Sequence, residues 1–181
     1  MDCFARNGKE AALHSASLRS ARHDKRGAYF ARGMTHDLPD EHFMRAALRE
    51  ARLALAAGEI PIGAVVVLGN EIIGRGHNQT ERLRDVTAHA EMLALTAAAN
   101  GLGNKYLAEC RLYVTVEPCP MCAGASAWAQ VKKIIYGAAE PKFGFGRHGK
   151  GLLHPRTTVQ SGVLAAECAA LMHEFFHSKR K

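Results

Sequence analysis

The chain is organised around TAHAE (residues 87–91) and EPCPMC (residues 117–122), two short stretches that must meet in space. Together they supply one imidazole, two thiols and a carboxylate, in the order His-x-Glu followed by Pro-Cys-x-x-Cys. Zn²⁺ prefers nitrogen and sulfur ligands in a tetrahedron, and three protein ligands leave the fourth position open for water. The two stretches therefore predict a zinc site with His89, Cys119 and Cys122 as its ligands.

Helical placement explains how these residues could serve as ligands. Cys119 and Cys122 stand three residues apart, so on a helix that begins after Pro118 both sulfurs project from one face. The helix macrodipole favours thiolate over thiol near such an N-terminus, and thiolate is the form that binds metal. His89 begins a second predicted helix, for which Thr87 is the expected cap.

Glu91 is not needed as a ligand, so its carboxylate is free to transfer protons. Each motif alone has a simpler explanation, because a lone Cys-x-x-Cys is often a redox pair or half of a structural zinc site. Joined in this order, with Pro before the first Cys, the motifs resemble the signature of zinc-dependent nucleobase deaminases. That resemblance implies that Glu91 moves protons from water to the ring nitrogen and then to departing ammonia.

Length and composition are those of an ordinary globular protein. The chain has 181 residues, enough for one domain with an appendage. Its net charge of +7 favours a polyanionic partner without identifying one. No apolar run approaches the ~20 residues that a membrane-spanning helix needs, so we expect no membrane association. The five cysteines, an odd number without a dense pattern, are typical of a reducing compartment.

Residues 1–38 differ in composition from the rest of the chain. They are rich in Ser, Arg, Gly and His without a sustained apolar period, and residues 1–36 carry a net charge of +4. We expect this basic extension to be disordered and residues 39–181 to form the zinc-dependent deaminase domain. Asp2 weakens the alternative of an organelle transit peptide, because such peptides are usually poor in acidic residues. The preferred interpretation is an upstream extension of a protein that starts physiologically at Met34.

The remaining sequence alternates helices with strands. Apolar spacing and breaker residues predict helices over 40–57, 88–99, 119–130 and 164–179, and strands over 61–67, 71–76, 111–117, 132–137 and 158–163. The second helix should stop at Asn100-Gly101. This order predicts an α/β fold in which three layers, α/β/α, are built on a sheet of about five strands.

Over roughly residues 40–180 the chain resembles the bacterial tRNA-specific adenosine deaminases of the cytidine deaminase superfamily. The resemblance rests on PIGAV (61–65), Asn78, TAHAE (87–91), LYVTVEPC (112–119), MCAGA (121–125), LHP (153–155) and ECAAL (167–171). It implies a cytidine-deaminase-like fold with a mixed sheet, one Zn²⁺ per subunit, a cytoplasmic homodimer, and deamination of adenosine to inosine at the wobble position of the tRNA anticodon. It also implies that Asn78 contacts the flipped nucleotide and that backbone around Ala90 and Pro118 lines the base pocket.

Two basic, aromatic segments are candidates for contact with the anticodon loop, residues 143–150 and residues 175–181. Single-stranded RNA is read by stacking its bases on aromatic or Arg side chains beside a basic groove. The candidate RNA contacts are Phe143, Phe145, Arg147, Lys150, Phe176, Lys179 and Arg180. The plainer interpretation is a solvated loop followed, in the last helix, by a core pair of phenylalanines. Many family members carry a Gly-Ala loop in place of residues 143–150, so the details of the RNA contact stay open.

Two other functions remain open. Guanine deaminases share the His-Ala-Glu and Pro-Cys-Pro-Met-Cys motifs, and Trp128 is reminiscent of them, so a guanine or other small-molecule purine or nucleoside deaminase is the alternative. A structural zinc module would need a fourth ligand, and the candidates Cys110, Cys168 or a remote His do not stand at motif spacing. Free-cytidine deaminases typically have Cys in place of His89, which argues against that class.

Overall fold

The computed structural model describes residues 38–180, apart from the side chain of Lys150. Its elements in chain order are α2 (Asp40–Ala56), β1 (Gly63–Leu68), β2 (Glu71–His77), α3 (Thr80–Leu83), α4 (Ala90–Leu102), β3 (Cys110–Val116), α5 (Pro120–Trp128), β4 (Lys133–Ala138), the 3-10 helices η1 (Phe145–His148) and η2 (Lys150–Leu152), β5 (Thr158–Gln160) and α6 (Ala165–Ser178). The predicted N-terminal extension, up to residue 37, lies outside the described residues. No helix within residues 38–180 is long and apolar enough to cross a membrane.

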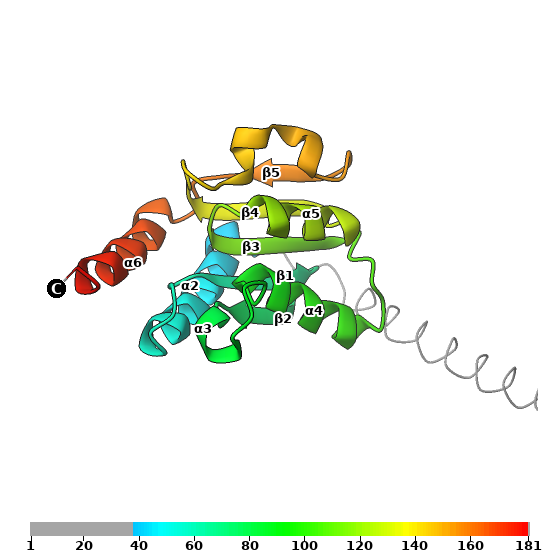
Figure 1. Cartoon of the computed structure of the whole chain (residues 1–181). Coiled ribbons are helices and arrows are strands. Elements are labelled where there is room, and N and C mark those ends of the chain that lie inside the picture. The colour runs from blue at the N-terminus through cyan, green and yellow to red at the C-terminus, as the bar shows by residue number, and fades with distance from the viewer. Residues whose placement is uncertain (1–37, 181) are drawn as a thin grey trace, which may run out of the picture. The chain divides into compact units, whose positions relative to one another are not determined.

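Five strands form one mixed sheet in the order β2-β1-β3-β4-β5 (Figure 1). β1 runs antiparallel to both β2 and β3, whereas β3, β4 and β5 run parallel to one another. The β1–β2 hairpin turns at Gly69-Asn70, where Gly69 adopts a positive φ of 57° that glycine tolerates best. The predicted sheet of about five strands is confirmed.

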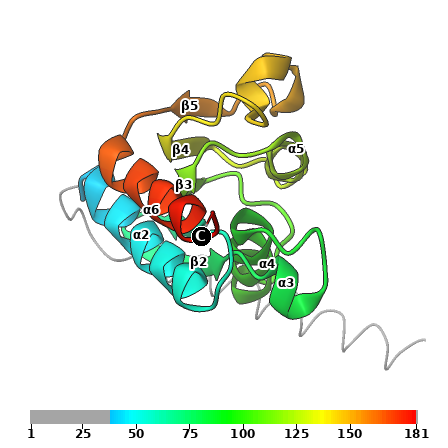
Figure 2. The ribbon, with the colours of Figure 1, turned by 60° about the vertical axis from the view of Figure 1, so that its left-hand side comes forward.

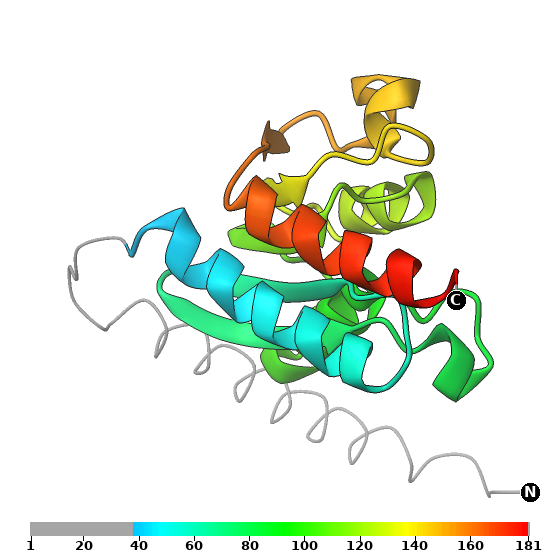
Figure 3. The same ribbon diagram turned by 90° about the vertical axis from the view of Figure 1, so that its left-hand side faces the viewer.

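Helices cover both faces of the sheet, which confirms the predicted α/β/α layering. α2 and α6 lie side by side on one face (Figure 3), while α4 and α5 lie on the opposite face (Figure 2). The buried face of α2 includes Phe43, Met44 and Leu48, which pack in the main core cluster. All six residues of β1 are buried because helices cover both its sides, and its sequence is therefore apolar throughout rather than alternating.

Glycines let the helices lie directly on the strands. A Cβ at Gly76 in β2 would overlap the carbonyl oxygen of Ala90 and lie 2.7 Å from the backbone nitrogen of Ala94, both in α4. Gly63 in β1 faces α2 in the same way, with its missing Cβ directed at the carbonyl oxygen of Ala47. Only glycine fits at such a close approach of backbone to backbone. The first turn of α4 is therefore held directly against β2.

Among the element ends that differ from the prediction, two are displaced by three residues. α4 continues through Asn100-Gly101 to Leu102, because the residue that adopts the left-handed capping conformation is Gly103, with φ 61°. β5 ends at Gln160 rather than at Val163, and so it is an edge strand of only three residues.

The short helix α3 was not predicted, because its cap comes from a distant residue. The buried Glu59 carboxylate accepts hydrogen bonds from the backbone N–H groups of Glu81 (3.3 Å) and Arg82 (2.8 Å) and from the Thr80 hydroxyl (3.3 Å). Burial raises the pKa of Glu59, but these bonds and one from the Asn78 amide outweigh it, so the pKa lies below its usual value. A charged carboxylate thus stabilises the start of α3.

Candidate active site

His89 is the N-cap of α4. Its backbone is extended (φ −72°, ψ 154°), and its carbonyl accepts the hydrogen bond of the Leu93 N–H group at 3.1 Å. The prediction that Thr87 caps this helix is wrong, because the Thr87 hydroxyl and N–H both donate to the Asp85 carboxylate, at 2.7 and 2.8 Å. Asp85 closes the turn before the helix, and the imidazole is presented at the helix N-terminus.

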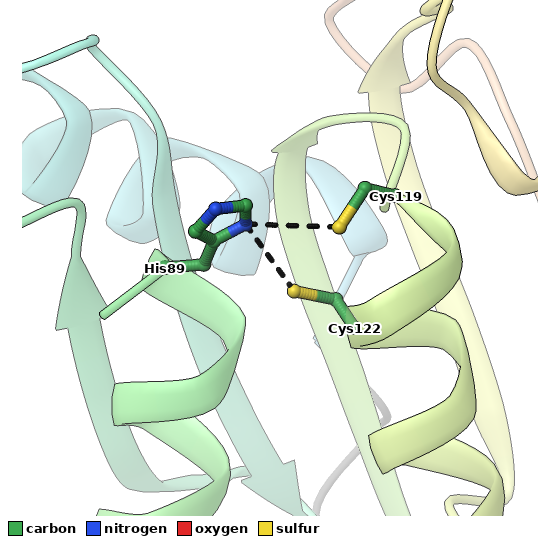
Figure 4. Close-up of side chains that lie close together, drawn as sticks. All are labelled: His89, Cys119 and Cys122. Carbon is green, nitrogen blue, oxygen red and sulfur yellow. Dashed lines mark hydrogen bonds between the residues drawn. The ribbon is translucent and has the colours of Figure 1, made fainter. Parts of the chain in front are cut away.

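Cys119 and Cys122 lie at the start of α5. Cys119 is the N-cap (φ −73°, ψ 168°), and its carbonyl accepts the Ala123 N–H group at 2.9 Å. Pro120 takes the first helical position, where the missing N–H group of proline leaves no hydrogen bond unmade. The helix therefore begins one residue later than the predicted start directly after Pro118. Cys122 follows in the first turn with its side chain fully buried. The N-termini of α4 and α5 thus both direct their positive dipole ends at the ligand side chains (Figure 4).

The three predicted ligands converge on one point. Nδ1 of His89 lies 3.7 Å from Sγ of Cys119 and 3.6 Å from Sγ of Cys122 (Figure 4), and all three ligand atoms lie within 4.8 Å of one another. A tetrahedral zinc ion with bonds of about 2.0 Å to nitrogen and about 2.3 Å to sulfur separates such atoms by roughly 3.5–3.8 Å. The donor set and its spacing therefore fit Zn²⁺. Within residues 38–180 it is the one group of three or more His, Cys, Asp or Glu side chains with metal-ligand spacing.

Hydrogen bonds within this cluster distinguish the two thiols. The bond with Cys122, together with one from His89, lowers the pKa of Cys119 to about 4, so that its sulfur is a thiolate at neutral pH. The same contact and burial raise the pKa of Cys122, and the bond to Cys119 raises the pKa of His89. A divalent cation would replace the proton between the two sulfurs and favour thiolate at both.

Glu91 lies in the first turn of α4 and is only 4% exposed, yet it lines the same pocket as His89 and Cys119. Burial raises the pKa of its carboxyl, and the neighbouring Cys119 thiolate raises it further, while His89 lowers it. The carboxyl is not a member of the metal-binding cluster. A carboxyl with a raised pKa beside a metal site is suited to take up and release a proton.

A pocket of about 810 Å³ gives access to the cluster. It is lined by Ile60, Ile62, His89, Glu91, Val116, Glu117, Cys119, Glu140, Pro141, Lys142, Phe143, Met172, Phe176 and Arg180. Several of these residues follow the carboxyl ends of the parallel strands β3 and β4, the usual place for ligands in α/β sheets. The volume lies within the range of roughly 300–1,000 Å³ that holds small molecules.

The candidate RNA contacts separate into two groups. Phe143, Phe176 and Arg180 line the pocket, and both rings are well exposed, at 71% and 45%. Phe145 is only 5% exposed and packs edge-on against Tyr136, so the structure places this ring in the core rather than on an RNA-binding surface. The physical reason is the η1 turn, which directs the ring inward.

The other candidate RNA contacts do not line the pocket. The Arg147 guanidinium donates to the carbonyl oxygen of Pro141 at 3.0 Å. The Lys179 ammonium lies over the Phe175 ring, 5.4 Å from its centre. The side chain of Lys150 lies outside the described part of the structure.

The predicted substrate contacts Asn78, Ala90 and Pro118 are all buried and are not among the pocket-lining residues. The direct neighbours of Ala90 and Pro118 in sequence, including Glu91 and Cys119, do line it. The three substrate contacts therefore stay predictions.

Sequence reasoning missed Glu117, Glu140 and Lys142, which line the pocket. The position of Glu117, directly before the Pro-Cys motif, is a signal that could have drawn attention to it. Glu140 and Lys142 lie in an irregular loop, where no periodicity marks a functional side chain.

Comparisons with known proteins agree with this geometry. Residues 38–138 match the family described as the cytidine and deoxycytidylate deaminase zinc-binding region. The chain is 44% identical to a tRNA-specific adenosine deaminase of Bacillus subtilis over 147 residues, which cover 78% of this chain and 91% of that protein. A solved structure from studies of A-to-I editing by tRNA:A34 deaminases at the wobble position is 42% identical with a TM-score of 0.68, covering 72% of this chain and 98% of the other.

A guanine deaminase of Bacillus subtilis is a more distant structural neighbour, 38% identical with a TM-score of 0.55, covering 62% of this chain and 71% of the other. The His-Cys-Cys cluster is thus the zinc site of a deaminase fold, and Glu91 stands beside it as a buried carboxyl. The chain belongs to the family of tRNA-specific adenosine deaminases, within the zinc-dependent cytidine and deoxycytidylate deaminases.

Proposed function

We propose that this protein catalyses the hydrolytic deamination of adenosine to inosine at the wobble position of a tRNA anticodon. The observation that carries the proposal is one pocket with two different walls. The zinc-side wall, His89, Glu91 and Cys119, holds the metal-binding cluster and the buried carboxyl. The RNA-side wall, Lys142, Phe143, Phe176 and Arg180, is basic, aromatic and exposed. A flipped base can reach the zinc-side wall while neighbouring nucleotides contact the RNA-side wall.

The zinc-side wall has the groups that hydrolytic deamination needs. Zinc, when bound here, lowers the pKa of water and supplies a nucleophile near neutral pH. Glu91 moves one proton of the attacking water to the ring nitrogen beside carbon 6, and then moves the hydroxyl proton to the exocyclic amine. The carbon–nitrogen bond breaks and ammonia leaves, so that adenosine and water become inosine and ammonia. The N-termini of α4 and α5 stabilise the anionic ligands around this reaction.

The predicted base contacts are retained as part of the proposal. The Asn78 amide nitrogen donates to Glu59 and to Thr80, each at 3.2 Å, which uses both of its protons. A contact of Asn78 with the flipped nucleotide would therefore use its carbonyl oxygen as an acceptor, for example from a ribose hydroxyl. Backbone around Ala90 and Pro118 is proposed to line the base pocket.

The RNA-side wall comes from two separate elements. Lys142 and Phe143 lie in the loop after β4, whereas Phe176 and Arg180 come from the last turn of α6 and the residue beyond its C-cap. The two exposed rings offer surfaces for base stacking, and the two cations offer phosphate contacts. We propose that the nucleotides beside the wobble adenosine bind here.

A direct test offers two substrates to the zinc-loaded protein. One is an anticodon stem-loop RNA with a wobble adenosine, and the matched control RNA carries adenosine at a neighbouring loop position instead. The other substrate is free guanine, the substrate of the alternative. We expect inosine at the wobble position only and no xanthine. Xanthine formation without inosine would instead establish a guanine deaminase. This is the second candidate function, because the chain shares its motifs with guanine deaminases and is similar to one in structure.

We further propose a homodimer that uses an exposed apolar face of α5. Met121 and Trp128 stand seven residues apart, so they lie on one face of this helix, and they are 37% and 86% exposed. A Cβ at Gly124, between them, meets no atom within 4 Å, so no described side chain covers the helix at this point. An exposed tryptophan on such a face is typical of a protein interface. Trp128→Arg should convert the dimer to a monomer in light scattering after size-exclusion chromatography.

A cytoplasmic location is part of the same proposal. The four cysteines within residues 38–180 are all free, and thiolate ligands need a reducing compartment. We propose residues 1–38 as a basic extension of the catalytic domain, residues 39–181. Its net positive charge would add to the attraction for RNA.

A further inference from the structure

The loop after β4 is bonded at two points to one carboxylate. Glu117 Oε2 accepts the backbone N–H group of Glu140 at 3.1 Å, and Glu117 Oε1 accepts the backbone N–H group of Gly146 at 2.9 Å. These donors stand six positions apart in the chain, and hydrogen bonds to a charged acceptor are the stronger kind. Glu117 itself stands two residues before the zinc ligand Cys119.

Glycines allow the loop to close around this carboxylate. A Cβ at Gly144 would lie 2.5 Å from the Glu117 carboxyl carbon and 2.6 Å from its Oε2, and a Cβ at Gly146 would lie 2.8 Å from Oε1. Between them Phe145 is buried, and its N–H group donates to the carbonyl oxygen of Pro118 at 2.9 Å. The backbone of the loop therefore fits the carboxylate closely and leaves no room for a side chain at either glycine.

The segment between the two bonded donors carries half of the RNA-side wall. Lys142 and Phe143 lie between Glu140 and Gly146, and both line the pocket. Phe143 is 71% exposed, so little packing restrains its ring, and the direction of the ring depends on the path of the backbone. Glu117 bonds the backbone at both ends of that path.

We propose that Glu117 is a positioning residue for substrate binding: its carboxylate holds residues 140–146 in the conformation that presents Lys142 and Phe143 to the nucleotides beside the target base. The inference rests on the proposed function, since it takes RNA as the ligand of this wall. It gives Glu91 and Glu117, which both line the pocket, different roles. Glu91 moves protons at the reacting base, whereas Glu117 acts through the loop on how tightly the RNA is held.

The first test is Glu117→Gln in the full chain, with Glu109→Gln as the matched control, because Glu109 is an exposed partner of Lys132 outside the pocket. The glutamine places an NH₂ group against one of the two backbone donors, so one hydrogen bond is lost. With the wobble-adenosine stem-loop we expect KM to rise about ten-fold while kcat falls less than about three-fold. Zinc content should stay at one per chain. An unchanged KM, or a loss carried mainly by kcat, would overturn the proposal.

The second test asks whether Glu117 acts through the loop. In a variant that already carries Lys142→Ala and Phe143→Ala, adding Glu117→Gln should raise KM by less than about two-fold, because the side chains that it positions are gone. Gly146→Ala changes the loop instead of the glutamate, and it should also raise KM, because its Cβ would displace the Glu117 carboxylate. Gly151→Ala, whose Cβ meets no atom within 4 Å, is its control. A full ten-fold effect of Glu117→Gln in the double-alanine background would exclude the loop as intermediary.

The two proposals fail in different ways. If the unmodified protein forms no inosine in the stem-loop, the proposed function fails, and this inference fails with it. If the unmodified protein is active and Glu117→Gln binds a stem-loop with guanosine at the wobble position as tightly as the unmodified protein does, only the role of Glu117 is wrong.

Discussion

The zinc-side wall and the RNA-side wall of the pocket are built by different means. His89, Glu91 and Cys119 come from the first residues of α4 and α5, and α4 lies directly on the sheet through glycine contacts. Phe143 and Phe176 come from a loop and a final helical turn and are well exposed. Close packing therefore sets the geometry of the first wall, whereas a few hydrogen bonds set that of the second.

This difference has a kinetic consequence. Substitutions in the zinc-side wall should change zinc content or kcat, since they alter groups that act on the reacting base. Substitutions in the RNA-side wall should change KM, since they alter groups that we propose hold the RNA. We expect the effects to decrease from the zinc ligands, through the supporting fold, to the exposed ring.

Loss of a zinc ligand should have the largest effect. Cys122→Ala removes a fully buried sulfur from a three-ligand site, and we expect zinc below stoichiometric content and a fall in activity of more than about 10⁴-fold. Metal analysis and inosine formation measure the two effects. Cys168→Ala is the matched control, because this buried cysteine lies outside the cluster and its loss should leave zinc bound.

Loss of the carboxyl that we propose transfers protons should leave the metal in place. Glu91→Gln keeps the size of the buried side chain but cannot accept a proton, so kcat should fall about 10²–10⁴-fold while zinc stays at one per chain. Glu174→Gln, on the exposed side of α6, should change neither. A zinc-loaded Glu91→Gln protein with ordinary turnover would remove Glu91 from the mechanism.

The packing of α4 on β2 can be tested at Gly76. A Cβ there overlaps the α4 backbone beside Glu91, so Gly76→Ala should lower the free energy of unfolding by about 1–3 kcal/mol, as measured by urea denaturation. Gly101→Ala in the last turn of the same helix is the control. Its Cβ meets only the Ile73 carbonyl oxygen at 3.7 Å, so it should be neutral or stabilising. Equal effects of the two substitutions would contradict the close approach.

Glu59 should stabilise the folded protein only while it is charged. Its folded-state pKa lies below the ordinary value of 4.5, so its contribution is complete above that pH and is lost as the pH falls through the folded-state pKa. Glu59→Gln should therefore cost about 1–2 kcal/mol near pH 7, and the difference from the unmodified protein should shrink below about pH 4. Urea denaturation of both proteins at the two pH values measures this. A difference that grows on acidification would contradict the lowered pKa.

The exposed ring of the RNA-side wall should have the smallest effect. Phe143→Ala removes one stacking surface, so KM for the stem-loop should rise about five-fold, which corresponds to ~1 kcal/mol, while kcat changes less. Tyr106→Ala removes another exposed ring that does not line the pocket and should leave KM unaltered. A fall in kcat with constant KM would contradict a role of Phe143 in RNA binding.

Local spacing accounts for what was predicted correctly about the site and the fold. A His-x-Glu motif and cysteines at i and i+3 specify a zinc-binding donor set whatever surrounds them, and continuous or alternating apolar runs specify the strands. Predictions from local spacing were wrong where another nearby residue was better placed to cap or to begin a helix. Thr87 is a good cap by type, yet the carboxylate of Asp85 takes its hydrogen bonds, and Pro120 rather than Pro118 occupies the first turn of α5.

Residue order alone identifies the metal-ligand motifs, Glu91 as the candidate acid–base carboxyl, and the strands and helices, because each of these patterns depends on neighbours a few positions apart. The three-dimensional arrangement was needed to find the burial of Phe145 and the roles of Glu59 and Glu117. These carboxylates bond backbone groups that lie 22 to 29 residues away along the chain. No periodicity or motif encodes a contact at that separation, since it exists only after the strands and helices have packed.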